Sequence, residues 1–150
     1  MTNEEFKLKL VELARNWATS KIPFQHRGAS RKGCDCIGLF VGIMKELGMM
    51  VNFQLPFYER DWNRGKDPEV LTKNFSPYYE VITREELEPG DMILFAFAGR
   101  VIHSGIYIGD NLFVHSHQGS NVRIDTLRLS PWTSRVHYFI RLKLEALSQL

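Results

Sequence analysis

Two closely spaced cysteines and three distant histidines are the residues of this chain whose types and spacing could do chemistry. The cysteines lie in Gly33-Cys34-Asp35-Cys36, directly before an apolar run. The histidines are His103, His115 and His117. A thiol at the N-terminus of a helix is easier to ionise, and the backbone N–H groups there can bind an oxyanion. The pattern predicts a thiol nucleophile with an imidazole base.

A second use of the cysteine pair is binding a metal ion. Zinc would need two further ligands, and His26 is the only nearby one, with no second pair at a recognised spacing. A disulfide between Cys34 and Cys36 would close a strained ring. We therefore expect no metal and no cofactor.

Helical periodicity marks the elements that must hold the thiol. Apolar residues recur at helical spacing from Ile37 to Leu47, and Gly48 is a plausible end. The same period predicts an opening helix over Thr2–Ser20, with Asn3 as a possible cap. The polar segment 25–33 between the two helices is predicted to be a loop at one lip of a cleft.

From Pro89 onward the period changes to two. The pattern predicts five short strands, over Met92–Phe97, Val101–Ile108, Leu112–His117, Val122–Asp125 and Val136–Leu142. Helices followed by strands indicate an α+β domain with an antiparallel sheet. The aromatic-rich stretch 49–79 is harder to interpret; we predict a short helix near Pro68–Asn74 and treat its aromatic residues as a satellite core or a substrate-contacting wall.

The strands on either side of Gly109-Asp110-Asn111 are expected to pair as a hairpin. With a three-residue loop, His103, His115 and His117 share one face of the sheet, whereas a two-residue loop would put His103 on the opposite face. One histidine would then act as base and a second would orient it. Parity alone does not choose between His115 and His117.

Composition favours one globular domain over residues 1–150, with 44% hydrophobic residues and a formal charge of +2. Scattered basic residues do not indicate a nucleic-acid partner. The sequence has no run long enough to span a bilayer and no secretory signal pattern, so synthesis in the cytoplasm is expected.

These motifs, in this order, resemble the NlpC-type cell-wall cysteine peptidases, and within them the branch found in phages and prophages. The matching segments are Ala14 to Phe24, Gly33 to Leu39, Tyr58 to Trp62, Leu87 to Asp91, His103 to Gly109 and Phe113 to Ser116. The resemblance covers about residues 6–142. It implies a minimal papain-like α+β fold, in which the helix that carries the nucleophile packs on an antiparallel sheet.

The resemblance also implies roles for individual residues. Cys36 matches the nucleophile, His103 the base and His115 the third, orienting residue. Asp35 matches a residue that binds a free amine of the substrate, although it could equally cap the helix. Phe24, Ser104 and Gly105 are further substrate-binding candidates. Phe24 and Ile37 replace a Tyr and a Ser of many members, so two hydroxyl groups are missing near the site.

The implied activity is hydrolysis of the bond between D-glutamate and a diamino acid in peptidoglycan stem peptides, through a thioester. The implied partners are the stem peptide and, for the phage branch, tail proteins that carry the enzyme to the cell wall. Two alternatives remain. One is an amidase or acyltransferase acting on a substrate outside the wall, and the other is a structural module of a tail assembly.

Overall fold

The computed structural model of the protein describes residues 1–58 and 76–150. Two predicted features lie outside these residues: the helix near Pro68–Asn74, and Trp62 at the end of the matching segment Tyr58 to Trp62. No helix in the described segments combines the length and the apolar character needed to cross a bilayer.

The first helix, α1, spans Asn3–Thr19 and buries Phe6, Leu10, Ala14 and Trp17 along one face. The sequence predicted this helix, but its cap is Thr2 and not Asn3. The Thr2 hydroxyl accepts a hydrogen bond from the N–H of Glu5, and the Glu5 carboxylate accepts one from the N–H of Thr2. This reciprocal capping box satisfies two N–H groups at the helix start.

The second helix, α2, spans Cys36–Glu46, so Cys36 is its first residue. Asp35 caps the helix by accepting a hydrogen bond from the N–H of Gly38 at 2.8 Å. After the helix, Gly48 has a φ of +79°, a left-handed conformation that suits glycine at this position. The segment before α2 is not wholly a loop, because β1 (Ala29–Ser30) and β2 (Gly33–Cys34) pair there as a small antiparallel hairpin.

Gly38 allows this hairpin to approach α2. A Cβ atom at Gly38 would lie 1.6 Å from the carbonyl oxygen of Gly28, so even an alanine would collide with the backbone. Close packing against the hairpin therefore requires glycine at position 38, two residues after Cys36.

The main sheet has six antiparallel strands in the order β3-β8-β4-β5-β6-β7. In chain order the strands are β3 (Tyr79–Ile82), β4 (Met92–Phe97), β5 (Arg100–Gly109), β6 (Leu112–Ser116), β7 (Val122–Thr126) and β8 (Val136–Leu142). Sequence reasoning predicted five of them and missed β3. It also missed the short C-terminal helix α4 (Leu144–Ser148). Short 3₁₀ helices occupy Ser76–Tyr78, Arg84–Glu86 and Trp132–Ser134.

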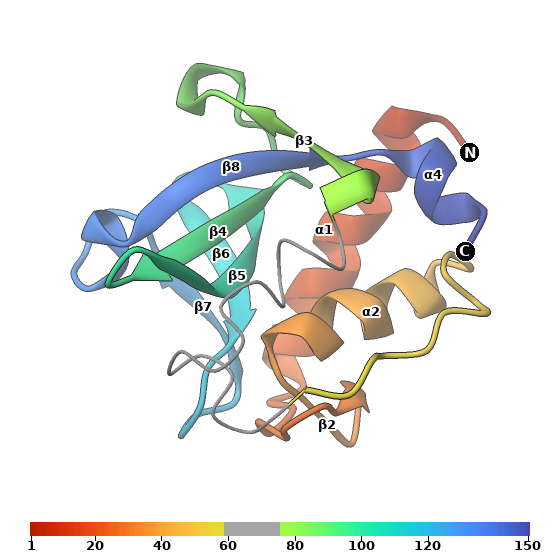
Figure 1. Cartoon of the computed structure of the whole chain (residues 1–150), viewed down its shortest axis with the longest axis horizontal. Coiled ribbons are helices and arrows are strands. Elements are labelled where there is room, and N and C mark those ends of the chain that lie inside the picture. Colours follow the sequence, from red (N-terminus) through yellow and green to blue (C-terminus); the bar gives the residue numbers. More distant parts are fainter. Residues whose placement is uncertain (59–75) are drawn as a thin grey trace.

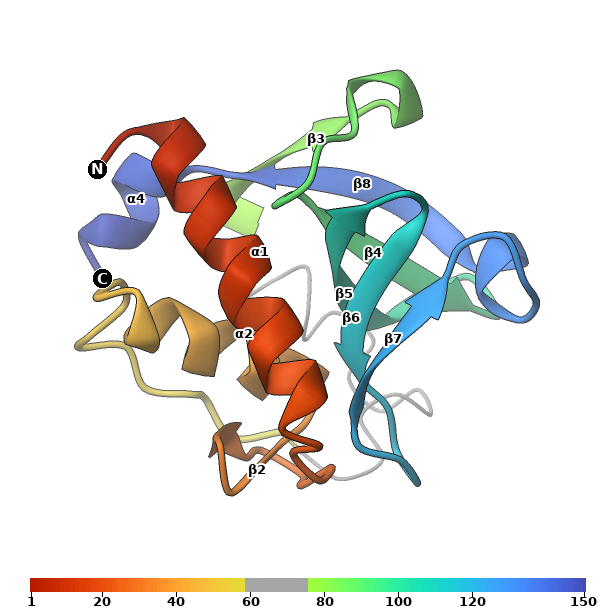
Figure 2. The ribbon, with the colours of Figure 1, turned by 180° about the vertical axis from the view of Figure 1, so that it is seen from behind.

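Helices α1 and α2 lie together on one side of the sheet, and the two chain ends meet near α4 (Figures 1 and 2). The predicted α+β architecture is confirmed. Alternate strand residues such as Leu94, Ile106 and Val114 belong to the core that includes both helices. Their neighbours Phe95 and Phe113 face a second, smaller cluster on the other side of the sheet.

The hairpin of β5 and β6 reaches the expected register by an unexpected route. Its turn has two residues, Asp110 and Asn111, both with positive φ. Tyr107 nevertheless pairs with Phe113, because Ile108 is an extra residue in a bulge before Gly109 pairs with Leu112. Of the two loop lengths considered, the structure has the two-residue turn, and the bulge restores the parity that a three-residue loop would have given.

The segment Pro89-Gly90-Asp91 ends in a residue that forms buried ion pairs. Asp91 is fully buried and receives two hydrogen bonds from the Arg141 guanidinium, at 3.0 and 2.9 Å. Lys7 of α1 lies 3.3 Å from the same carboxylate. Asp91 therefore ties α1, β4 and β8 together.

Candidate active site

A cleft of about 430 Å³ opens where the start of α2 meets the sheet. Its wall includes both Cys36 and His103, together with residues from the loop before α2, from the end of β6 and from the 3₁₀ helix at 132–134. The lining residues are Phe24, Gln25, His26, Asp35, Cys36, Phe97, Ile102, His103, Ser116, His117, Gln118 and Trp132. The predicted nucleophile and the predicted base thus share one cleft.

Cys36 is 5% exposed and interacts with both the backbone and the side chain of Ser104 on β5. Burial and the nearby charge of Asp35 raise the pKa of the Cys36 thiol to about 12. The helix N-terminus led us to expect easier ionisation, and here burial opposes it. The resting site therefore holds a neutral thiol.

His103 and His115 form a directly hydrogen-bonded pair. Nε2 of His103 lies 2.8 Å from Nδ1 of His115, and Nε2 of His115 lies 2.6 Å from the Asp125 carboxylate on β7. Burial lowers the pKa of His103 well below its usual value and also lowers that of His115, where the Asp125 hydrogen bond acts against the burial. Both rings are therefore neutral near pH 7, and Nδ1 of His103 is the nitrogen left for the thiol.

Trp132 covers the histidines. Its ring stacks on His103 with a centroid distance of 5.3 Å and an interplanar angle of 29°, and it meets the His115 ring edge-to-face with a centroid distance of 4.7 Å. His117 lies 5.7 Å from the His103 ring and also contacts Trp132. All three histidines thus gather on one face, and it is His115 that hydrogen-bonds to His103.

Asp35 is a buried residue at the start of α2 whose carboxylate accepts three hydrogen bonds. One carboxylate oxygen accepts from the N–H of Gly38, and the other accepts from the N–H of Arg27 at 2.8 Å and the hydroxyl of Tyr58 at 2.5 Å. The carboxylate therefore fixes the helix start, the preceding loop and the segment at Tyr58 in one arrangement. Although Phe24 has no hydroxyl group, Tyr58 places one on Asp35.

The structure separates the remaining predicted residues. Phe24 lines the cleft, and Ser104 lies behind Cys36, away from the cleft wall. Gly105 is not a cleft residue; a Cβ atom there would lie 2.8 Å from the Phe113 ring, so its small size serves packing in the sheet. Cys34 is fully buried and does not line the cleft. Within residues 1–58 and 76–150, no three His, Cys, Asp or Glu side chains form a metal-binding group.

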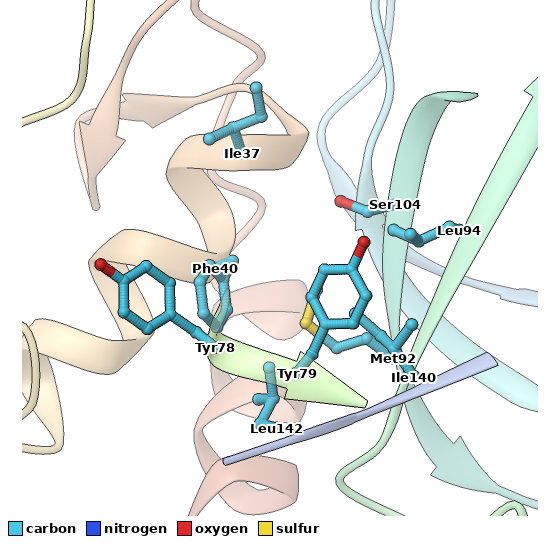
Figure 3. A pocket seen from close by; sticks show the side chains of 9 residues that line it. All are labelled: Ile37, Phe40, Tyr78, Tyr79, Met92, Leu94, Ser104, Ile140 and Leu142. Carbon is cyan, nitrogen blue, oxygen red and sulfur yellow. The ribbon is translucent and has the colours of Figure 1, made fainter. Parts of the chain in front are cut away.

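A second, much smaller cavity of about 30 Å³ lies between α2 and the sheet, on the side of Ser104 away from the cleft. Ile37, Phe40 and Tyr79 contribute to its apolar wall, and the Tyr79 hydroxyl points toward Ser104 (Figure 3). This volume holds one or two water molecules. It is too small for a substrate residue, so the larger cleft is the candidate binding site.

Sequence reasoning missed Asp125 and Trp132 as parts of the site. For Asp125 a signal existed: in the paired strands Arg123 lies opposite His115, and Asp125, two residues further, must share that face. For Trp132 no local signal existed, since it comes from the connection before β8.

Comparisons with known proteins identify a family for the chain. A family model described as the NlpC/P60 family matches residues 21–141. The murein DD-endopeptidase MepS/murein LD-carboxypeptidase of Escherichia coli (strain K12) is 27% identical over 135 residues, covering 89% of this chain. The chain spans 61% of the length of that protein.

Solved structures show the same fold. An NlpC/P60 family protein from Bacillus cereus superposes with a TM-score of 0.66 at 23% identity, over 91% of this chain and 40% of that one. RipD from Mycobacterium tuberculosis, described as a non-catalytic NlpC/p60 domain protein adapted to peptidoglycan binding, gives 0.58 at 14% identity, over 91% of this chain and 96% of that one.

Proposed function

Because this chain belongs to the NlpC/P60 family, a family of peptidoglycan hydrolases, we propose that it is a cysteine peptidase of the cell wall. Its reaction is hydrolysis of the bond between the γ-carboxyl of D-glutamate and a diamino acid, such as diaminopimelate, in the stem peptide. The observation that carries the proposal is the shared cleft of Cys36 and His103, with His103 held by His115.

In the first half of the reaction, Nδ1 of His103 takes the thiol proton as Sγ of Cys36 bonds to the γ-carbonyl carbon. A neutral thiol and a neutral imidazole favour transfer of the proton during the attack over a preformed ion pair. The N–H of Cys36 is the first of α2, where the helix itself offers no acceptor, so it can donate to the oxyanion.

In the second half, the C–N bond breaks and the proton on His103 goes to the leaving amine. Water then attacks the thioester while His103 takes one of its protons. The C–S bond breaks, the D-glutamyl carboxyl group is released, and the thiol of Cys36 regains its proton. The protein's own side chains supply every proton transfer of this scheme.

Asp35 can serve both roles considered for it. An ionised carboxylate has about four lone-pair positions, and three accept protein hydrogen bonds here. One position, on the oxygen that accepts from Gly38, remains for an amine of the substrate. Its main role in this proposal is to hold the start of α2 and the cleft lip that carries Arg27.

The test is digestion of purified peptidoglycan that contains diaminopimelate, with the released fragments identified by mass spectrometry. We expect wild type to release fragments cut after D-glutamate, and Cys36→Ala and His103→Ala to lose at least about 1,000-fold in turnover. Cys34→Ala is the matched control, since Cys34 is also buried but lies outside the cleft wall. Equal activity of Cys36→Ala and wild type would refute the assignment.

A second candidate function is binding of peptidoglycan without hydrolysis, as described for RipD. The observation that favours it is the raised pKa of the Cys36 thiol. The two functions differ in one readout: a binding module would retain peptidoglycan on a pull-down column but release no fragments. Fragments of a different amide or ester substrate would instead support the amidase or acyltransferase alternative.

We also propose that a phage or phage-like particle carries the enzyme to the wall, because Ile37 follows the nucleophile as in the phage branch. Mass spectrometry of particles purified from the host tests this. Presence of the chain in the tail fraction supports the proposal, and its presence only in unassembled protein contradicts it.

A further inference from the structure

A carboxylate stands behind the histidine pair, on the strand beyond it. Asp125 of β7 lies 2.6 Å from Nε2 of His115, and Nδ1 of His115 in turn faces Nε2 of His103. We propose that Asp125 is a positioning residue that fixes the tautomers of both histidines and so leaves the lone pair of His103 on Nδ1, toward Cys36. The proposal rests on the proposed function for its catalytic meaning, but its geometry can be tested separately.

The direction of each hydrogen bond follows from the carboxylate. The hydrogen bond from His115, together with the nearby Arg123 guanidinium, keeps the pKa of Asp125 below its usual value, so Asp125 is ionised and can only accept. Nε2 of His115 must then carry the hydrogen, which leaves a lone pair on its Nδ1. That lone pair accepts from Nε2–H of His103, so Nδ1 of His103 has no hydrogen.

The surroundings keep the rings in this orientation. His115 is fully buried and His103 is 7% exposed, and Trp132 covers both. A ring flip of either histidine would break the 2.8 Å hydrogen bond inside this packed cluster. With the rings held in place, the carboxylate alone decides which nitrogen carries each hydrogen.

Asp125 also acts while the reaction proceeds. When His103 takes the thiol proton it becomes a cation in a buried site, and the negative charge two hydrogen bonds away stabilises that cation. The Arg123 guanidinium, 3.1 Å from the same carboxylate oxygen, partly offsets this effect. The Arg123 guanidinium is also a hydrogen-bond donor, so it favours an acceptor atom at the position of this carboxylate oxygen.

A purely structural role is the competing explanation, since the contact also joins β6 to β7. It predicts a lower melting temperature for variants of Asp125, with unchanged tautomers and turnover. The positioning role instead predicts changed histidine tautomers and lower turnover, with a melting temperature close to that of wild type. The side chain of Asp125 is 24% exposed, so its replacement leaves room for water and does not prevent folding.

The first measurement is nitrogen-15 NMR of the histidine rings in wild type near pH 7. We expect His103 and His115 each to carry hydrogen on Nε2 alone. Hydrogen on Nδ1 of His103 would overturn the proposal without any variant.

The second measurement compares Asp125→Ala, Asp125→Asn and the matched control Asp110→Asn, which lies in the exposed turn at a φ that asparagine also adopts. Loss of a partner that orients a histidine lowers activity by about 10- to 100-fold, and a reversed histidine tautomer lowers kcat by up to about 10⁴-fold. We expect Asp125→Ala to lose about 100-fold in kcat with KM within threefold. Asp125→Asn should lose only about tenfold, because Arg123 directs its carbonyl oxygen toward His115.

Alkylation of Cys36 by iodoacetamide provides a readout that needs no wall substrate, with Cys34→Ala as the background. We expect the same order of rates: wild type and Asp110→Asn, then Asp125→Asn, then Asp125→Ala. If the four proteins alkylate in this order but the wild type cleaves no peptidoglycan, the proposed function fails and the positioning role stands. Equal alkylation and turnover across the series would overturn the positioning role.

Discussion

Asp35→Asn tests how the start of α2 controls the thiol. Asparagine can keep its oxygen toward the N–H of Gly38, but its amide group then faces the N–H of Arg27, a donor against a donor. Tyr58 also loses a charged acceptor. A buried donor left without an acceptor costs about 1–3 kcal/mol, and loss of a charge-assisted hydrogen bond adds about 1 kcal/mol, giving about 2–4 kcal/mol. For a chain of this size the melting temperature falls by roughly 5–15 °C.

The same substitution should make the thiol more reactive. The charge of Asp35 is the second cause, after burial, of the raised pKa of Cys36, so its removal lowers that pKa. At a fixed pH between 7 and 8, a larger fraction of the thiol is ionised and alkylation of Cys36 becomes faster. The prediction is thus a less stable protein with a more reactive cysteine.

Calorimetry and iodoacetamide kinetics, both in the Cys34→Ala background, measure the two effects. Asp110→Asn is again the matched control, since it removes one carboxylate in an exposed turn. Slower alkylation in folded Asp35→Asn would show that the carboxylate helps to ionise the thiol and would refute this reasoning. An unchanged melting temperature would show that the three hydrogen bonds contribute little.

Three further predictions concern the frame of the site. Gly38→Ala should cost about 3 kcal/mol or more, because its Cβ atom meets the Gly28 carbonyl, and wild-type stability in urea would contradict this. Asp91→Ala should cost about 1–3 kcal/mol, because it removes the buried acceptor of two Arg141 hydrogen bonds while Glu88 still pairs with Lys7 and Arg141, yet leave the Cys36 alkylation rate per folded molecule unchanged. Acidification from pH 7 to 5.5 should lower the free energy of unfolding. Burial lowers the pKa of His103 and that of His115, so below about pH 6.5 the unfolded chain binds more protons than the folded chain. This difference lowers the free energy of unfolding by up to about 1.4 kcal/mol per pH unit for each histidine. Equal urea midpoints at both pH values would refute the last prediction.

Much of the fold follows from periodicity. The limits of β4 and β8 agree with the predicted strands, and Cys36 begins α2 as its neighbouring residues indicated. These elements have long, regular apolar patterns. Strand β3 and helix α4 are short, and both are stabilised by tertiary contacts at the edge of the sheet, which a local pattern does not contain.

The site was less predictable than the fold. The residue types and the hairpin indicated His103 and His115, but the resemblance was needed to choose His115 over His117. The pKa of Cys36 could not be predicted, because it depends on burial by distant segments that oppose the helix terminus. Tyr58, whose hydroxyl donates a hydrogen bond to Asp35 at the start of α2, lies 23 residues beyond Asp35, outside any local pattern.

The bulge at Ile108 makes the site sensitive to chain length. A two-residue turn plus one extra strand residue keeps His115 on the face of His103. Deleting one residue from this hairpin would point His115 away while leaving every side chain present, whereas changes of two residues would preserve the pairing. Length variation among natural or designed versions of this hairpin should therefore occur in steps of two, and an alignment that scores only residue identity would miss a version inactivated by a single-residue gap.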